Sequence, residues 1–130
     1  MPEINPSSYS PLTLAFYGDA VYSLLVRRYL VKIANRPAGE LHSMAVKLVR
    51  AGAQAKGIAA IADKLTDKEM SVFKRGRNAH VGHTPKSSTD AEYHAATGLE
   101  ALFGYLSLAG MDDRAEELFG MIIDATEPLE

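Results

Sequence analysis

The chain has 130 residues, of which 47% are hydrophobic, which is enough for one domain with a buried core. It has no cysteine, which excludes disulfides, thiolate chemistry and cysteine-ligated zinc and suits a reducing compartment, so a cytoplasmic protein is expected. A net charge of −2 excludes a uniformly basic nucleic-acid binder.

Residues 1–9 hold two prolines and are expected to form a loosely held N-terminal arm, followed by one domain over residues 10–130. This N-terminus has no basic flank before an apolar segment, so it does not predict a signal peptide. Ser10 followed by Pro11 gives a helix N-cap and a proline at the first helical position. The first helix is therefore predicted to begin there and to run to about Ala34.

This first helix carries an isolated acid. From Pro11 to Val26, the only side chain that is charged at neutral pH is Asp19. Burying a carboxylate is costly unless it is paired or binds a metal, so Asp19 needs a partner from elsewhere in the chain. Gly18 beside it is unfavourable inside a helix and indicates that another backbone or a ligand comes close.

Apolar residues at helical spacing predict the remaining elements, and no segment of strand length alternates with period 2. The fold class predicted is all-α, a helical bundle. Thr66 and Glu69 form a capping box, and Ser88 or Thr89 can cap a later helix. After the break at Pro37, which can open the second helix, the helices are expected to span about 37–50, 51–64, 66–79, 89–110 and 112–125.

Positive charge is concentrated in two regions without acids. The first region, residues 41–62, carries Lys47, Arg50 and Lys56. The second region, residues 70–89, covers the end of a predicted helix and a basic loop predicted at residues 80–88. A basic zone in an acidic protein indicates a polyanion-binding face, although such runs are often only solvated surface. The candidate RNA-binding residues of the second region are Lys74, Arg75, Arg77, Asn78 and Lys86.

A second isolated acid occurs late in the chain. Between Tyr93 and Met111 the only acid is Glu100. Two apolar helices with one carboxylate each are the skeleton of a divalent-metal site, because carboxylates are the hard oxygen ligands that Mg²⁺ prefers. The alternative is that Asp19 and Glu100 lie on helix surfaces or pair with arginines.

Other candidates for chemistry are weaker. The spacing of the loop histidines and the one beyond them fits no standard metal motif, and His42 is expected to pack between helices. The aromatic residues of the first and fifth long helices are expected in the core, with Phe16 considered separately. The three histidines without a metal motif are His80, His83 and His94. The aromatic residues expected in the core are Tyr17, Tyr22, Phe103 and Tyr105.

Three blocks, in order, resemble the ribonuclease III catalytic domain. Leu14–Tyr22 (LAFYGDAVY) resembles its signature helix, Leu41–Val49 its second block and Leu99–Leu106 its late acidic helix. With Phe73–Ala79 before the basic loop, and no room for a following double-stranded-RNA-binding domain, the chain resembles the Mini-ribonuclease III family. The resemblance covers about residues 11–110.

The resemblance implies a homodimeric endoribonuclease that cuts double-stranded RNA with Mg²⁺, for which Mn²⁺ could substitute. The products would carry 5′-phosphates and 3′-hydroxyls, and the substrate would be the precursor of large-subunit (23S) ribosomal RNA. Asp19 and Glu100 would be the catalytic metal ligands. Phe16 would enter a socket on the partner subunit, whereas the alternative for Phe16 is packing in its own core.

Two positions depart from full-length ribonuclease III, which has acids where this chain has Ala15 and Thr97. Thr97 lies three residues before Glu100 on the same helix face, so its hydroxyl could orient a water of the metal, or bond its own backbone. The missing acids motivate an alternative, a non-catalytic ribonuclease III-like protein that binds RNA or ribosomes. A second alternative is a helical interaction domain with an acidic docking helix at the C-terminus.

Overall fold

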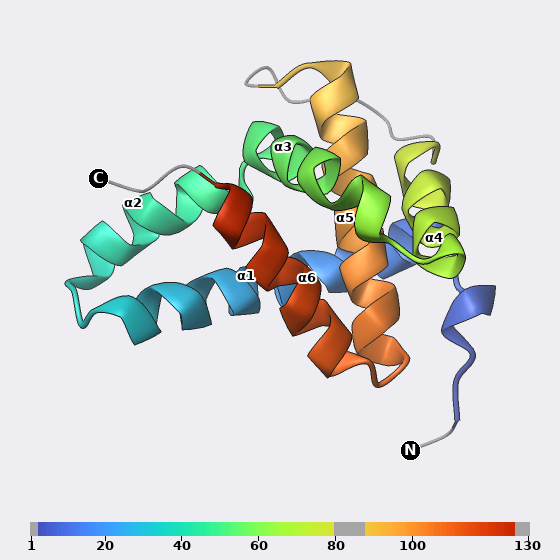
Figure 1. Cartoon of the computed structure of the whole chain (residues 1–130), viewed down its shortest axis with the longest axis horizontal. Helices are drawn as coiled ribbons and strands as arrows, with labels where there is room; N and C mark the ends of the chain where they lie inside the picture. Colours follow the sequence, from blue (N-terminus) through green and yellow to red (C-terminus); the bar gives the residue numbers. More distant parts are fainter. Residues whose placement is uncertain (1–2, 80–87, 127–130) are drawn as a thin grey trace.

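The structure, a computed structural model, describes residues 3–79 and 88–126. Within these ranges the chain forms six α-helices and two short 3-10 turns and contains no strand, so the predicted all-α class is confirmed (Figure 1). The elements are η1 (Pro6–Ser8), α1 (Pro11–Ile33), α2 (Ala38–Val49), α3 (Ala51–Ile61), η2 (Ala62–Lys64), α4 (Asp67–Arg77), α5 (Asp90–Leu108) and α6 (Asp112–Ala125).

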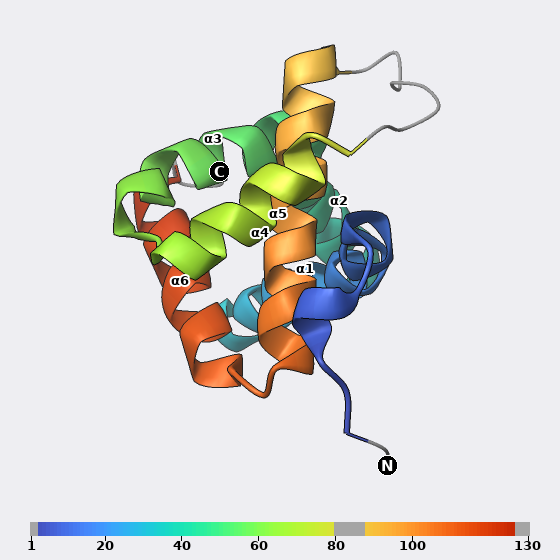
Figure 2. The same cartoon turned by 90° about the vertical axis from the view of Figure 1, so that its right-hand side faces the viewer.

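Helix α5 lies at the centre of the domain. It contacts α1, α3, α4 and α6, and Figures 1 and 2 show these helices packed around it. Apolar residues cover α5 on several sides, which is the pattern of a buried central helix rather than a surface helix. Its fully buried residues include Leu99, Ala101, Leu102, Phe103 and Leu106.

Helices α1 and α5 cross at two glycines. A Cβ atom on Gly18 would overlap the carbonyl group of Glu100, and a Cβ atom on Gly104 would overlap the carbonyl oxygen of Leu14. Only glycine allows the two backbones to approach this closely. The expectation that another backbone comes close to Gly18 is therefore confirmed, and the crossing places Asp19 beside the turn that carries Glu100.

The main core lies on one side of this crossing and is built around aromatic rings. Tyr22 of α1 meets Phe103 of α5 and Phe119 of α6 edge to face, with ring centroids 5.1 and 5.5 Å apart. Such pairs are worth about 0.5–1.5 kcal/mol each beyond the area that they bury. The predictions that Tyr22 and Phe103 are core residues are confirmed, and these contacts fix the face of α1 that carries Tyr22.

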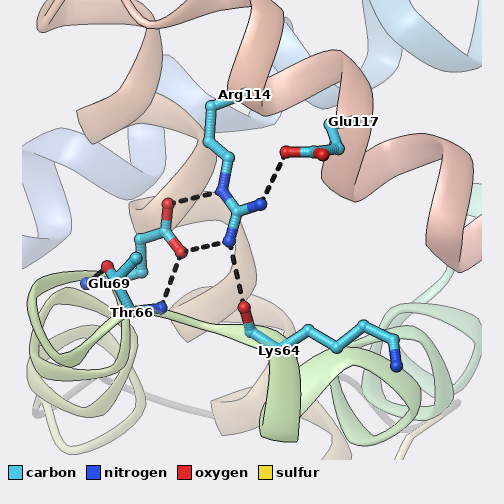
Figure 3. Close-up of polar contacts among 5 residues, drawn as sticks. All are labelled: Lys64, Thr66, Glu69, Arg114 and Glu117. Carbon is cyan, nitrogen blue, oxygen red and sulfur yellow. Dashed lines mark hydrogen bonds and ion pairs between the residues drawn. The ribbon is translucent and has the colours of Figure 1, made fainter.

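Helices α4 and α6 are joined by a buried ion pair, shown in Figure 3. Arg114 donates through Nε and Nη2 to the two carboxylate oxygens of Glu69, at 2.8 and 2.9 Å, and its Nη2 also donates to the carbonyl of Lys64. Glu69 completes the predicted capping box with Thr66. The Arg114 hydrogen bond holds the pKa of Glu69 below its usual value despite burial.

Some predicted details were wrong. Tyr17 is 40% exposed rather than buried, and its hydroxyl is hydrogen-bonded to that of Ser107 at 3.1 Å. His42 is exposed rather than packed between helices. Pro37 is the N-cap of α2 and not its first residue.

The arm is held more closely than its composition suggested. Residues 6–8 form a 3-10 turn, and Tyr9 packs against the small core cluster that contains Leu14 and Val72. Arg75 donates to the carbonyl of Tyr9 at 3.3 Å. Among the described helices, none is both long and apolar enough to cross a bilayer.

Candidate active site

Asp19 and Glu100 come together at the crossing of α1 and α5. Asp19 follows Gly18, whose Cβ position meets the Glu100 backbone, and the Asp19 carboxylate is close enough to raise the pKa of Glu100. Asp19 is exposed and Glu100 is half-buried. Two acids that are 81 positions apart in sequence therefore form one site open to solvent on the Asp19 side.

The electrostatics of this pair favour a cation. Burial raises the pKa of Glu100 to about 8, and the charge of Asp19 and the hydrogen bond between the two acids add to this rise. At neutral pH the pair therefore retains a proton on Glu100, because two neighbouring carboxylates resist ionising together. A divalent cation held by the carboxyl groups of Asp19 and Glu100 would replace this proton and would cancel the repulsion between the two negative charges.

The donor set is small but suits a hard, hydrated cation. Over residues 3–79 and 88–126, no group of three or more His, Cys, Asp or Glu side chains could hold a metal. The protein would supply two carboxylates, and a buried carboxamide oxygen of Gln54 lies in the same neighbourhood without a hydrogen-bond partner. Mg²⁺ commonly keeps several waters and takes substrate phosphate oxygens, so this set fits it.

The two positions without an acid are filled differently. Ala15 is buried in the small cluster with Val72 and Ala101. Thr97 is also buried, and its hydroxyl donates to the carbonyl of Tyr93 at 3.0 Å. The proton of Thr97 is thus used within its own helix, while the lone pairs of its oxygen can still accept a hydrogen bond.

Gln54 is a residue beside the two acids that the sequence did not predict as part of the candidate site. It lies on α3, is only 2% exposed, and donates through Nε2 to the carbonyl of Val49 at 2.9 Å and to Oε2 of Glu100 at 3.4 Å. The only signal in the sequence was a long polar residue among the alanines and glycines of a helix suited to close packing. The sequence alone does not show which residue Gln54 contacts, because that contact depends on how α3 packs against α5.

Tyr22 borders the same site from α1. Burial, and then the charge of Glu100, raise the pKa of its phenol far above the usual value. It therefore stays neutral at physiological pH. Tyr22 also lines a hollow of about 380 Å³ that Lys47, Arg50 and Lys56 line as well, so one acid-free region of the sequence shares this hollow with Tyr22.

The other basic region lies at the end of α4. Lys74, Arg75, Arg77 and Asn78 are found there, and three of them line an open hollow of about 690 Å³. Arg77 stacks over the ring of Phe73 and donates to the side chain of Asn78 at 3.2 Å. Lys86, His80 and His83 lie outside the described residues, and His94 is half-buried on α5.

Phe16 is 84% exposed, which excludes the alternative that it packs in its own core. Residues four apart lie on one face of a helix, and Leu12 and Leu24 on the Phe16 side of α1 are also exposed. Large exposed apolar stripes of this kind mark interaction surfaces.

Comparison with known proteins gives consistent matches. The sequence model of the ribonuclease III domain matches residues 12–111. The chain is 44% identical over 120 residues to a Mini-ribonuclease 3 of Thermoanaerobacter sp., covering 92% of this chain and 84% of that protein. It is 43% identical over 123 residues to a Mini-ribonuclease 3 of Symbiobacterium thermophilum, covering 95% of each.

A similar fold is found among solved structures. A crystal structure of a protein from Fusobacterium nucleatum superposes with a TM-score of 0.82 at 29% sequence identity. The superposition covers 91% of this chain and 94% of that protein.

Proposed function

This chain belongs to the ribonuclease III domain family and is an endoribonuclease of that class, and from this premise we propose that it cuts double-stranded RNA at a Mg²⁺ centre held by Asp19 and Glu100. The cut would leave 5′-phosphates and 3′-hydroxyls, and Mn²⁺ could replace Mg²⁺. The observation that carries the proposal is the glycine crossing of α1 and α5, which brings two otherwise isolated acids into contact.

The residues have distinct tasks in this proposal. Asp19 offers an exposed carboxylate, and Glu100 would lose its proton on holding the cation. A bound Mg²⁺ would supply an activated water and neutralise charge on the phosphate and on the leaving 3′ oxygen. Tyr22 stays neutral beside them. Thr97 keeps lone pairs that could accept from a water of the ion, and we retain it in that role.

We place the RNA on the basic end of α4, with Lys74, Arg75, Arg77 and Asn78, and on Lys86 of the following segment. Double-stranded RNA is recognised mainly through phosphates, 2′-hydroxyls and shape, which suits cations on a helix end. Lys74→Gln combined with Arg77→Gln should lower the slope of log affinity against log salt by roughly one for each phosphate that the variant no longer neutralises. An unchanged slope would indicate that the RNA binds at Lys47, Arg50 and Lys56 instead.

We further propose that the active form is a homodimer in the cytoplasm and that its substrate is precursor 23S ribosomal RNA. The exposed Phe16 supports the dimer. The resemblance of the sequence to the Mini-ribonuclease III family implies the ribosomal substrate. Faster cleavage of a precursor stem than of an unrelated duplex of equal length would support the ribosomal substrate. Equal rates would argue against it.

The experiment that tests the function is incubation with long double-stranded RNA, with and without Mg²⁺, followed by analysis of the product ends. We expect cutting only with Mg²⁺, and ends that a phosphatase must treat before a kinase can label them. Retention of intact RNA by a folded protein at every Mg²⁺ concentration would favour the non-catalytic RNA-binding alternative.

A further inference from the structure

Gln54 occupies an unusual position. It is one of three buried polar or charged side chains among the described residues, with Glu69 and Thr97. Glu69 is matched by Arg114, and Thr97 by its own helix backbone. Of these three, only the Gln54 side chain makes a hydrogen bond to one of the two acids of the proposed active site.

The orientation of the Gln54 carboxamide is determined by its neighbours. Val49 presents a carbonyl oxygen and Glu100 a carboxyl oxygen, and both accept hydrogen bonds, at 2.9 and 3.4 Å from Nε2. The two N–H bonds of the amide serve these two acceptors, so Oε1 must point elsewhere. Contacts in catalytic sites are often long without substrate and shorten in the assembled complex, so a distance of 3.4 Å to Glu100 is compatible with a catalytic site.

The carbonyl oxygen of the Gln54 amide has no hydrogen-bond partner among the described residues. This oxygen, Oε1, is also buried. Leaving a buried acceptor unpaired costs about 1–3 kcal/mol, whereas a leucine of similar size would carry no such cost. The packing of α3 on α5 alone therefore does not explain a glutamine here.

We propose that Gln54 is a positioning residue for the metal centre: Nε2 holds the Glu100 carboxylate towards Asp19, and Oε1 is kept for a water of the hydrated ion. This role depends on the proposed function, in which Asp19 and Glu100 bind a divalent cation. The proposed role of Gln54 also explains how a site with only two acids could hold a metal, since Ala15 and Thr97 provide no further carboxylate. Gln54 supplies polar oxygen and nitrogen without adding a charge.

The test is calorimetric titration of the RNA-free protein with Mn²⁺. Gln54→Leu removes both hydrogen-bonding ends and keeps the size, and we expect about a 10- to 100-fold weaker affinity, as is typical when a residue that orients a metal ligand is removed. Gln54→Met is the second variant if Gln54→Leu does not fold. Cleavage by these variants should need more Mg²⁺ but recover at saturating Mg²⁺.

Two matched variants separate the possible results. Ile58→Val changes the buried face of the same helix one turn later, so a purely structural effect would weaken Mn²⁺ binding there as well. Asp19→Asn should abolish Mn²⁺ binding. If folded Gln54 variants bind Mn²⁺ like the wild type while Asp19→Asn does not, the role of Gln54 is overturned and the proposed function stands. If Asp19→Asn also binds normally, the metal centre itself is wrong.

Discussion

At the scale of single residues, the most informative group is the carboxyl of Glu100. Its pKa is raised to about 8 by burial, by the charge of Asp19 and by their shared hydrogen bond. A raised acid pKa means that protonation competes with metal binding. Below about pH 8 a cation must displace this proton, so metal affinity should rise as the pH rises towards that value.

We therefore predict that Glu100 of the metal-free protein titrates near pH 8 and that Asp19→Asn shifts its pKa downward, because one of the causes of the rise has been removed. Carboxyl carbon chemical shifts, followed by NMR over roughly pH 4–10, measure this directly. Burial remains in the variant, so the pKa should stay above the ordinary value of 4.5. The same pKa in both proteins would mean that the two acids do not interact.

The sequence singles out Asp19 and Glu100 as candidates because each is the only acid in a long apolar stretch, and the structure brings these two residues together. Gln54 could not be found in this way. Its partners are the end of α2 and the middle of α5, and their proximity depends on how α3 packs. Thr97 illustrates a third case: the sequence left open whether its hydroxyl orients a water or bonds its own backbone, and in the structure the hydroxyl donates to the Tyr93 carbonyl.

At the scale of helices, the site depends on how closely α1 and α5 cross. Gly18→Ala would place a methyl group on the Glu100 carbonyl, so the helices must separate. We expect a loss of about 3 kcal/mol or more in unfolding free energy, measured by urea denaturation, because overpacking against rigid backbone cannot relax cheaply. Gly120→Ala is the matched control, since nothing lies within 4 Å of its Cβ position and alanine is the better helix former. Equal stability of the two variants would refute the crossing.

The pair of Glu69 and Arg114 gives a prediction about how α4 is held to α6. Glu69→Gln removes the buried partner of a partly exposed arginine that still contacts Glu117, and should cost about 1–3 kcal/mol at neutral pH. Glu117→Gln is the control, because Glu117 is exposed and contacts the same arginine, and its loss should cost under about 1 kcal/mol.

The pH dependence of this effect has a definite sign. The folded-state pKa of Glu69 is lowered, so the stabilisation is present above the unfolded value of 4.5 and is lost as the pH falls through the folded value. Denaturation of the wild type and of Glu69→Gln should therefore give a stability gap that narrows below pH 4.5. A gap that is independent of pH would assign the effect to packing rather than to charge.

Helix positions were largely predictable, because caps and breaks are local. The predicted capping box at Thr66 is present, Thr89 is the one of the two candidate caps that caps α5, and α1 and α6 begin as expected. The end of α3 was less predictable, since its last turn tightens into a 3-10 turn over Ala62–Lys64. The link between α4 and α6 was not foreseen, because Arg114 is the one cation in an acidic stretch and its partner lies 45 residues earlier.

At the scale of the whole molecule, the exposed Phe16 is expected to anchor a second copy of the chain. Phe16→Ala should weaken the dimer by about 2 kcal/mol, roughly thirty-fold in Kd, as is common for a central aromatic anchor. Sedimentation over a range of concentrations measures this. Val46→Ala, an exposed apolar residue on α2, is the control and should leave association unchanged. Identical sedimentation of wild type and Phe16→Ala would exclude Phe16 from the interface.

The central claim is that Asp19 and Glu100 work as one metal-dependent centre for cutting RNA. The most direct measurement is single-turnover cleavage of double-stranded RNA by the wild type, Asp19→Asn, Glu100→Gln and the double variant, with circular dichroism to verify folding. Residues that act as a unit have non-additive effects. Each single variant should lose at least about a hundred-fold in rate, and the double variant little more. A folded single variant that cuts at the wild-type rate, or losses that multiply in the double variant, would contradict the account.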